Sequence, residues 1–285
     1  MYDLLFVRKR RRRRIAALVA LFTSIGITSL VIISFLGRSV GTFTVSLKNS
    51  EVKLALCETK DSTNYSTYLH VNENSPYIPR SYYDYEDEIL SLDDESVQSK
   101  HKEYTYVDET DGKTKTGTYL EFFKYTFYVK NIGDKTASYK MKVVINNITK
   151  AEDGSDRGLD DILRVMVFEN KPDSTDQNYK IYAKKTPKYA NYTNYDIDGN
   201  ETDRELIAAV NENTHETEKY RLAEKFDEDD NRVITTYDMK NFTQNQMMRY
   251  TIVLWLEGDD QQCNRSAPDG ATLKIGVDID AKEGE

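Results

Sequence analysis

Oxygen-bearing side chains at alternate positions form the most suggestive chemical pattern in this chain of 285 residues. Carboxylates and one amide recur in a polar stretch, at Asp196, Asp198, Asn200 and Asp203. Calcium binds hard oxygen ligands that a loop supplies in this manner. The EF-hand loop, however, needs glycine at its sixth position, and Gly199 is the fourth residue here. The four residues therefore predict a loop that binds calcium weakly, and we expect no other cofactor.

Catalytic motifs do not stand out from the rest of the sequence. None of the histidines, His70, His101 and His215, has the spacing of a zinc-binding helix, and no glycine-rich phosphate loop occurs. Cys57 has no local signature of a catalytic thiol. Paired carboxylates are frequent because the chain has 48 acidic residues, so their proximity carries little information. We therefore expect the protein not to be an enzyme.

The two cysteines, Cys57 and Cys263, lie near opposite ends of the expected extracellular part. Each follows a predicted strand, and disulfides form in oxidising compartments. We predict a Cys57–Cys263 disulfide, which would constrain the unfolded chain by up to about 5 kcal/mol in the chain-entropy description. The alternative is a pair of thiols.

The N-terminal residues have the pattern of a membrane anchor that fixes which side of the membrane the rest of the chain occupies. Residues 8–14 are all basic and adjoin residues 15–37, which contain no charge. At about 1.5 Å per residue this 23-residue segment would be roughly 35 Å long as a helix, enough to cross a bilayer. Its 13 Leu, Ile, Val and Phe residues favour insertion by about 6 kcal/mol. The positive-inside bias then leaves residues 1–14 in the cytoplasm and residues 38–285 outside.

Cleavage by a signal peptidase is the alternative to a permanent anchor. Ser39-Val40-Gly41 has a residue pattern that could be cut. The uncharged segment is longer than the core of a cleavable signal, which is about 7–15 residues, and Phe35-Leu36-Gly37 is a poor recognition sequence. We favour an uncleaved, single-pass signal anchor in the cell membrane.

Charge restricts the partners of the expected extracellular part. The whole chain carries −9, residues 1–14 contribute +6 and residues 15–37 nothing, which leaves −15 for residues 38–285. Such a polyanion repels phosphate backbones, so we expect no nucleic-acid partner. Divalent cations, basic proteins and matrix components remain as partners.

Alternating apolar residues predict strands through most of the extracellular part. The predicted strands cover residues 42–47, 52–57, 101–107, 118–130, 137–147, 164–168, 179–183, 233–239, 247–257 and 271–281. A single helical turn is expected at 158–163 and a short helix at 203–210, with Thr202 as its N-cap and Glu205 at the capping-box position. The tyrosine-rich stretch 58–100 shows little periodicity and is the least ordered region that we expect.

Two strand pairs look like hairpins. Asp111-Gly112 predicts a turn into residues 118–130. Residues 131–134 look like a second turn, which would pair 118–130 with 137–147. Together these patterns predict a mainly β fold, an antiparallel two-sheet sandwich resembling a jelly roll, with loop and helix insertions, preceded by one transmembrane helix. Trp255, on an alternating strand, is expected to pack between the sheet and a loop.

The order of elements resembles the camelysin and TasA-type surface proteins of Gram-positive bacteria. The similarity rests on the apolar segment followed by Gly41-Thr42-Phe43, on the sequence YTFYVKNIG at 125–133, on the turn at 159–163 and on the closing strand at 271–281. The resemblance implies a jelly-roll domain at the cell surface or in the matrix, which in some members assembles into fibres by strand exchange. Peptidase activity is attached to camelysin, but no ligand motif for it is found in this chain.

The sequence thus predicts a membrane-anchored, non-enzymatic surface protein for adhesion, matrix contact or envelope assembly. The first alternative is a released matrix subunit that forms homo-oligomeric fibres through an exposed sheet edge. The second alternative is a surface hydrolase.

Overall fold

The computed structural model describes the segments that the sequence assigns to strands and most of the tyrosine-rich stretch 58–100. The described residues are 42–50, 52–73, 75–91, 98–107, 112–150, 158–176, 178–184, 194–195, 201–202, 223–227, 232–258, 263 and 271–284. Residues 1–14, the uncharged segment 15–37 and the expected helix at 203–210 lie outside these ranges. Among the described residues, no helix has the length and apolar character needed to cross a membrane.

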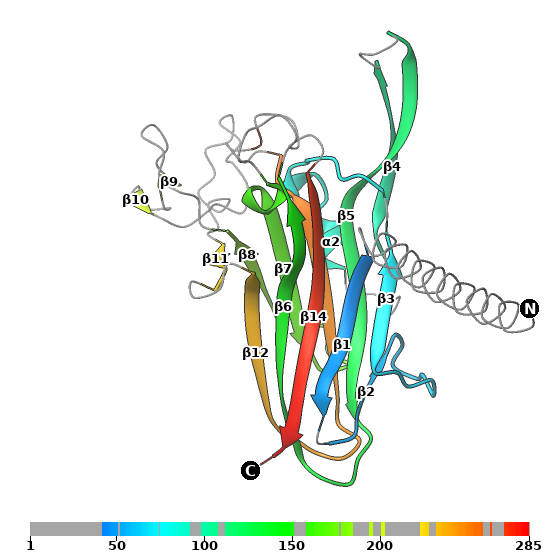
Figure 1. The fold of residues 1–285 in the computed structure, drawn as a ribbon, viewed down its shortest axis with the longest axis vertical. Coiled ribbons are helices and arrows are strands. Elements are labelled where there is room, and N and C mark those ends of the chain that lie inside the picture. Colours follow the sequence, from blue (N-terminus) through cyan, green and yellow to red (C-terminus); the bar gives the residue numbers. More distant parts are fainter. Residues whose placement is uncertain are drawn as a thin grey trace, which may run out of the picture. The chain divides into compact units, whose positions relative to one another are not determined.

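Strands in two large sheets dominate these residues, as the alternating pattern predicts (Figure 1). The first sheet has the strand order β12 (Val233–Phe242), β6 (Ala137–Thr149), β14 (Thr272–Glu283), β1 (Thr42–Ser50) and β3 (Tyr68–Asn72). The second sheet has the order β11 (Glu224–Lys225), β8 (Tyr179–Ala183), β7 (Leu163–Asn170), β13 (Met247–Leu256), β5 (Thr114–Asn131) and β2 (Leu54–Cys57), and β4 (Lys100–Val107) also pairs with β5. The short strands β9 (Asn194–Tyr195) and β10 (Glu201–Thr202) pair only with each other.

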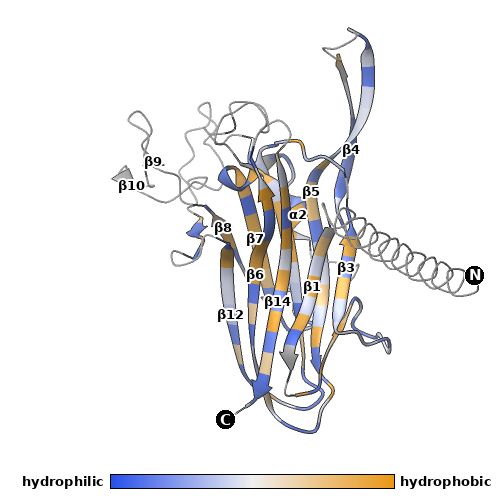
Figure 2. Ribbon diagram, viewed as in Figure 1, coloured by the Kyte–Doolittle hydropathy of each residue, from blue (hydrophilic) through white to orange (hydrophobic). Residues whose placement is uncertain are grey.

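The two sheets share one apolar core, which is formed by the inward side chains of both. Phe43 of β1 lies 5.2 Å from Phe123 of β5, measured between ring centroids. Deeper in the core, the hydroxyl groups of Tyr139 on β6 and Tyr250 on β13 are 2.7 Å apart. Figure 2 shows the alternation of apolar and polar residues that produces this core on β6 and β14. Each large apolar side chain buried here contributes roughly 1.5–3 kcal/mol to stability.

The expected antiparallel arrangement is only partly correct, because both sheets are mixed. β1 runs parallel to β14, with Thr44 opposite Gly276, and β11 runs parallel to β8. β1 and β14 are the first and last strands of the described chain, so no short turn requires them to be antiparallel. A side chain at Gly276 would place its Cβ only 2.8 Å from the hydroxyl oxygen of Thr44, so glycine permits this close pairing.

The hairpin predicted between residues 118–130 and 137–147 is wrong. β5 belongs to the second sheet and β6 to the first, so the connection crosses from one sheet to the other. The apolar faces of the two strands are therefore buried against each other across the core rather than side by side. A local alternation pattern cannot distinguish these two arrangements, because both bury the same residues.

Buried Asn131 holds this crossing in place. Its side-chain amide nitrogen donates to the carbonyl oxygens of Lys135, at 2.9 Å, and of Phe242, at 2.7 Å. Its side-chain oxygen accepts from the backbone nitrogen of Gly133 at 3.0 Å. Its backbone nitrogen and oxygen bond to Gln246 and Asn245. One side chain thus ties the crossing loop to the β12–β13 turn.

Several other local predictions are confirmed. β4 and β5 form an antiparallel hairpin, and Gly112 before β5 has the positive φ of 65° that the Asp-Gly turn implies. This hairpin extends beyond the neighbouring strands in Figure 1. The helical turn expected at 158–163 is the 3-10 helix η2 (Leu159–Asp161), just before β7. The strands expected at 164–168 and 179–183 are β7 and β8, and the structure pairs them antiparallel. β14 buries one face, as predicted for the closing strand.

The tyrosine-rich segment is more ordered than the sequence predicts. It contains the 3-10 helix η1 (Tyr82–Asp84) and the short helix α2 (Glu86–Leu90). Tyr82, Tyr85 and Ile89 are buried on the outer face of the second sheet, in a second apolar cluster. Buried Lys124 of the sheet donates to the carbonyl oxygens of Glu88 and Ser91 at the end of α2. The segment therefore forms a third layer over this sheet.

Trp255 lies beneath this layer, which confirms its predicted structural role. Its side chain is fully buried, and its ring centroid lies 5.4 Å from that of Tyr82. The indole nitrogen donates to the carboxylate of Glu257 at 3.1 Å, and the backbone nitrogen of Tyr82 donates to the same oxygen at 3.2 Å. Buried Glu257 thereby joins the third layer to the sheet.

Candidate binding cleft

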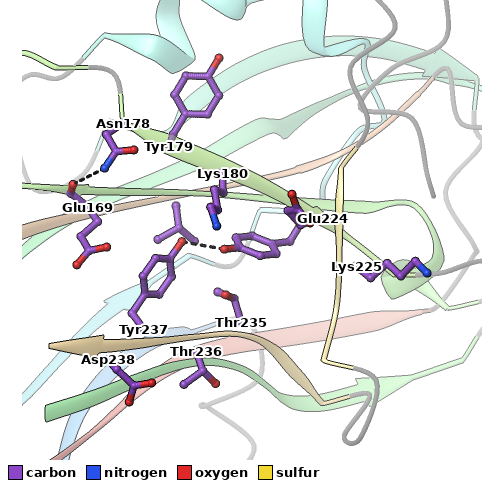
Figure 3. Close-up of a pocket in the computed structure, with 12 residues that line it drawn as sticks. Glu169, Asn178, Tyr179, Lys180, Glu224, Lys225, Thr235, Thr236, Tyr237 and Asp238 are labelled. Carbon is purple, nitrogen blue, oxygen red and sulfur yellow. Dashed lines mark hydrogen bonds between the residues drawn. The ribbon is translucent and has the colours of Figure 1, made fainter. Parts of the chain in front are cut away.

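A cleft of about 460 Å³ opens between β8 of the second sheet and β12 of the first (Figure 3). We call it the β8–β12 cleft. Among the described residues, β12 is the edge strand of its sheet, and beyond β8 the second sheet has only the two-residue strand β11. The residues that line the cleft come from β7, β8, β11, β12 and the turn before β8, and they are Val167, Glu169, Asn178, Tyr179, Lys180, Tyr182, Glu224, Lys225, Thr235, Thr236, Tyr237 and Asp238.

The inward positions of the strands become polar as they approach this opening. Along β7, the core residues Val165 and Val167 are followed on the same face by Glu169. On β8 the same face carries Lys180 and Tyr182, and Tyr237 on β12 packs against the core from the opposite sheet. The cleft is thus a polar side entrance to the space between the two sheets.

A pair of tyrosines joins the two sheets across the cleft. The hydroxyl groups of Tyr182 and Tyr237 are 3.0 Å apart, and a dashed line at Tyr237 in Figure 3 marks this hydrogen bond. Burial raises the pKa of Tyr237 far above its usual value, and the hydrogen bond with Tyr182 raises it further. The phenol of Tyr237 therefore stays neutral. Since one hydroxyl group donates to the other, one O–H of the pair remains available to a third group.

Glu169 is a carboxylate of the cleft whose pKa is shifted by burial. Burial raises its pKa above the ordinary value of 4.5, and the positive charge of Lys180 opposes this shift. Its main-chain oxygen accepts from the amide of Asn178 at 3.5 Å (Figure 3). Among the described residues, the carboxyl group of Glu169 and the ammonium group of Lys180 have no hydrogen-bond or salt-bridge partner. Both groups can therefore bond to a ligand or to water.

The outer face of the first sheet has a second depression of about 800 Å³, where β6, β12 and β14 lie side by side. Lys140 pairs there with Asp238 at 3.7 Å, and the exposed side chains of Lys240, Asp280 and Lys282 also line it. This depression lies on the face of one sheet, whereas the β8–β12 cleft is lined by residues of both sheets.

The predicted calcium ligands cannot be placed. Asp196, Asp198, Asn200 and Asp203 lie outside the described residues. Within the described ranges, no group of three or more His, Cys, Asp or Glu side chains is arranged to hold a metal ion. Weak calcium binding by the 196–203 loop stays a prediction.

The two cysteines are both buried. Cys57 lies at the end of β2, and burial raises the pKa of its side chain above 9.0. Cys263 is also fully buried. The predicted Cys57–Cys263 disulfide stays a prediction.

One short match to a catalytic pattern lies at the boundary of the uncharged segment. Residues 37–41 read Gly-Arg-Ser-Val-Gly, which fits the letters of the Gly-x-Ser-x-Gly nucleophile turn. That turn requires a preceding strand and a following helix, whereas here an expected helix precedes and a strand follows. The match lies outside the described residues and carries no catalytic assignment.

Sequence reasoning missed the cleft residues, although a signal for them exists. Glu169 and Lys180 occupy inward positions of strands whose other inward residues are apolar or aromatic. A charged residue at such a position is unfavourable unless the site is open or the charge is paired, so each marks a break in the core. The partner strand β12, far away in the sequence, could not be assigned from that signal.

Comparisons with protein-family models, with curated proteins and with solved structures found no match.

Proposed function

We propose that this chain is a single-pass, non-enzymatic surface protein that displays its two-sheet domain outside the cell for adhesion, matrix contact or envelope assembly. The observation that carries the proposal is the basic cluster at residues 8–14 followed directly by the uncharged residues 15–37. The charge of −15 on the remaining residues fits an exposed, soluble domain that avoids anionic lipid head groups.

The strand order supports a jelly-roll variant as the finer description of the domain. Eight strands (β1, β5, β6, β7, β8, β12, β13 and β14) form the sets β12-β6-β14-β1 and β8-β7-β13-β5. Successive strands along the chain alternate between the sheets at several points, as in the two Greek keys of a jelly roll. The parallel β1–β14 pair is the departure from that pattern. A jelly roll agrees with the resemblance to camelysin and TasA-type proteins.

The edge strands favour an anchored protein over a fibre subunit. β12 has two register irregularities, a positive φ of 53° at Asn241 and an exposed lysine at 240. β3, at the other edge of the same sheet, has only five residues. Bulges, charges and short length are features that limit pairing between sheet edges of different molecules. The released fibre subunit is therefore our second choice.

Fractionation of cells that express the full chain tests the proposal. Membranes are washed with alkaline carbonate, which removes peripheral proteins but leaves spanning helices in place. We expect the full-length chain, with its basic N-terminus, in the carbonate-resistant pellet. A shorter chain that lacks residues 1–37 and accumulates in the culture medium would instead support the released subunit.

A further inference from the structure

We propose that the β8–β12 cleft binds a neutral carbohydrate of one or two sugar rings. The inference deepens the proposed surface function, because it names the ligand class of the displayed domain and rests on that display for its biological use. The binding itself depends only on the residues of the cleft.

The size and the walls of the cleft suit a small polar ligand. Its volume of about 460 Å³ lies in the lower part of the range of small-molecule sites, which is about 300–1,000 Å³. Its polar groups come from two sheets and converge on one space, so they can contact different sides of one molecule (Figure 3). A flat protein surface would not offer this enclosure.

The charge of the whole domain disfavours strongly anionic ligands. In the cleft, the carboxylates of Glu169 and Glu224 face the ammonium groups of Lys180 and Lys225, and Asp238 pairs with Lys140 at 3.7 Å, so the local charges balance. A phosphate or a second carboxylate would therefore be repelled by the strongly negative domain without a surplus of positive charge in the cleft to attract it. A ligand without charge avoids this repulsion.

Hydrogen-bonding groups without a partner among the described residues, on half-buried Glu169 and exposed Lys180, favour hydroxyl-rich ligands. The carboxylate of Glu169 only accepts hydrogen bonds and the ammonium group of Lys180 only donates them, and neither has such a partner among the described residues. A sugar hydroxyl can donate to the first and accept from the second. Two neighbouring hydroxyl groups on one ring therefore match this pair of residues, and the amide of Asn178 and the hydroxyl groups of Thr235 and Thr236 offer further partners.

The tyrosine pair supplies the remaining contact that a sugar ring needs. Tyr182 and Tyr237 place aromatic rings beside the polar groups, and the available O–H of their hydrogen-bonded pair can bond to the ligand. The C–H face of a sugar ring can pack on such an aromatic surface while its hydroxyl groups reach the polar side chains. Purely apolar ligands would leave Glu169 and Lys180 unsatisfied.

Ligand-observed NMR on the full-length chain in detergent micelles tests the inference. The probes are the neutral sugars glucose, galactose, mannose, N-acetylglucosamine, lactose, maltose and chitobiose, with glucuronic acid and glucose 6-phosphate as charged counterparts. We expect saturation transfer to at least one neutral sugar and less to its charged counterpart. Affinity for that sugar is then measured by titration.

Matched variants locate the site. Glu169→Gln keeps the shape of the side chain, and Lys180→Met keeps most of its volume, but each removes a charge-assisted hydrogen bond. We expect each to weaken binding about tenfold or more. Lys240→Met and Asp280→Asn change exposed charges of the first sheet, outside the cleft lining, and should leave the affinity unchanged. Circular dichroism verifies that every variant remains folded.

Three results would overturn the inference. They are the absence of binding to every neutral sugar by the folded wild-type chain, preferred binding of the charged counterparts, and binding that survives both cleft substitutions. Membrane fractionation reports independently on the proposed function. A chain that binds sugar but is not anchored contradicts only the surface role, and an anchored chain that binds no sugar contradicts only the carbohydrate site.

Discussion

Asn131 provides the sharpest test of how the two sheets are connected. Its side chain makes three hydrogen bonds inside the protein, to Lys135, Phe242 and Gly133, at 2.9, 2.7 and 3.0 Å. Each such bond contributes about 1 kcal/mol, and the groups left behind in Asn131→Ala are partly buried and lose their partner. We therefore expect Asn131→Ala to lower the free energy of unfolding by about 3 kcal/mol.

Asn131→Asp separates the hydrogen-bond explanation from one based on volume. Aspartate has almost the same size as asparagine, but it cannot donate to the carbonyl oxygens of Lys135 and Phe242 and would bring a charge into a fully buried position. We expect Asn131→Asp at neutral pH to destabilise the protein at least as much as Asn131→Ala. Asn72→Ala, at an exposed position of the edge strand β3, is the control and should change stability by less than about 0.5 kcal/mol.

Urea titration of the full chain in detergent, followed by tryptophan fluorescence, measures these effects. Trp255 is the one tryptophan of the sequence and is fully buried, so its emission reports unfolding of the two-sheet domain. A loss below about 1 kcal/mol in Asn131→Ala, or wild-type stability in Asn131→Asp, would refute the role assigned to this side chain.

The remaining predictions concern buried polar groups. Tyr139→Phe should destabilise the domain by about 1–3 kcal/mol because it leaves the hydroxyl group of Tyr250 buried without its partner. In the same urea titration, the double variant with Tyr250→Phe should recover much of that lost stability, and additive losses from the two substitutions would contradict the coupling. The pKa of Glu169 is raised by folding, so its protonated form favours the folded state and this stabilisation is lost as pH rises above 4.5. As the pH rises from 4 to 7, the free energy of unfolding of Glu169→Gln should therefore increase relative to that of the wild type, by about the amount that ionisation of Glu169 costs the wild type. A difference in stability between the two proteins that does not change with pH would contradict the burial of this carboxyl group. Cys57 should react with iodoacetamide much more slowly in the folded chain than in urea, because its side chain is buried and its pKa is raised. Equal rates would contradict its burial, and the absence of alkylation in urea without a reductant would indicate a disulfide.

Local patterns were sufficient for most individual strands. The alternation of Tyr125, Phe127 and Val129 predicts β5, and Asp111-Gly112 predicts the turn that precedes it. These predictions succeed because each depends on neighbours within a few residues. The alternation around Trp255 likewise predicts its burial, which the third layer completes.

Relations between distant segments could not be obtained in the same way. Residues 131–134 look like a hairpin turn, but the buried Asn131 has as a partner Phe242, on a strand 111 positions away. The parallel direction of β1 and β14 also depends on segments at opposite ends of the domain. A strand buries the same face whether its partner is parallel or antiparallel and whether it lies in the same sheet or in the opposite one. The choice therefore depends on how the whole core packs.

The tyrosine-rich layer and the cleft were missed for different reasons. Tyr82, Tyr85 and Ile89 have the spacing of one helical face, but the stretch 58–100 as a whole shows little periodicity, so their burial on the sheet was not predicted. Glu169 stood out only as one of many acidic residues, because its inward position depends on the register of β7. Its significance came from Lys180 and Tyr237, which two other strands bring to the same opening.

The central claim is that the N-terminal anchor displays residues 38–285 on the outer surface. Protease treatment of intact cells tests this claim most directly. An antibody against the domain and an epitope tag placed before residue 1 follow the two sides of the membrane separately. We expect added protease to digest the domain on intact cells, while the tag survives on a short fragment until the cells are lysed. A domain that stays intact on whole cells and is degraded only after lysis would contradict the claim.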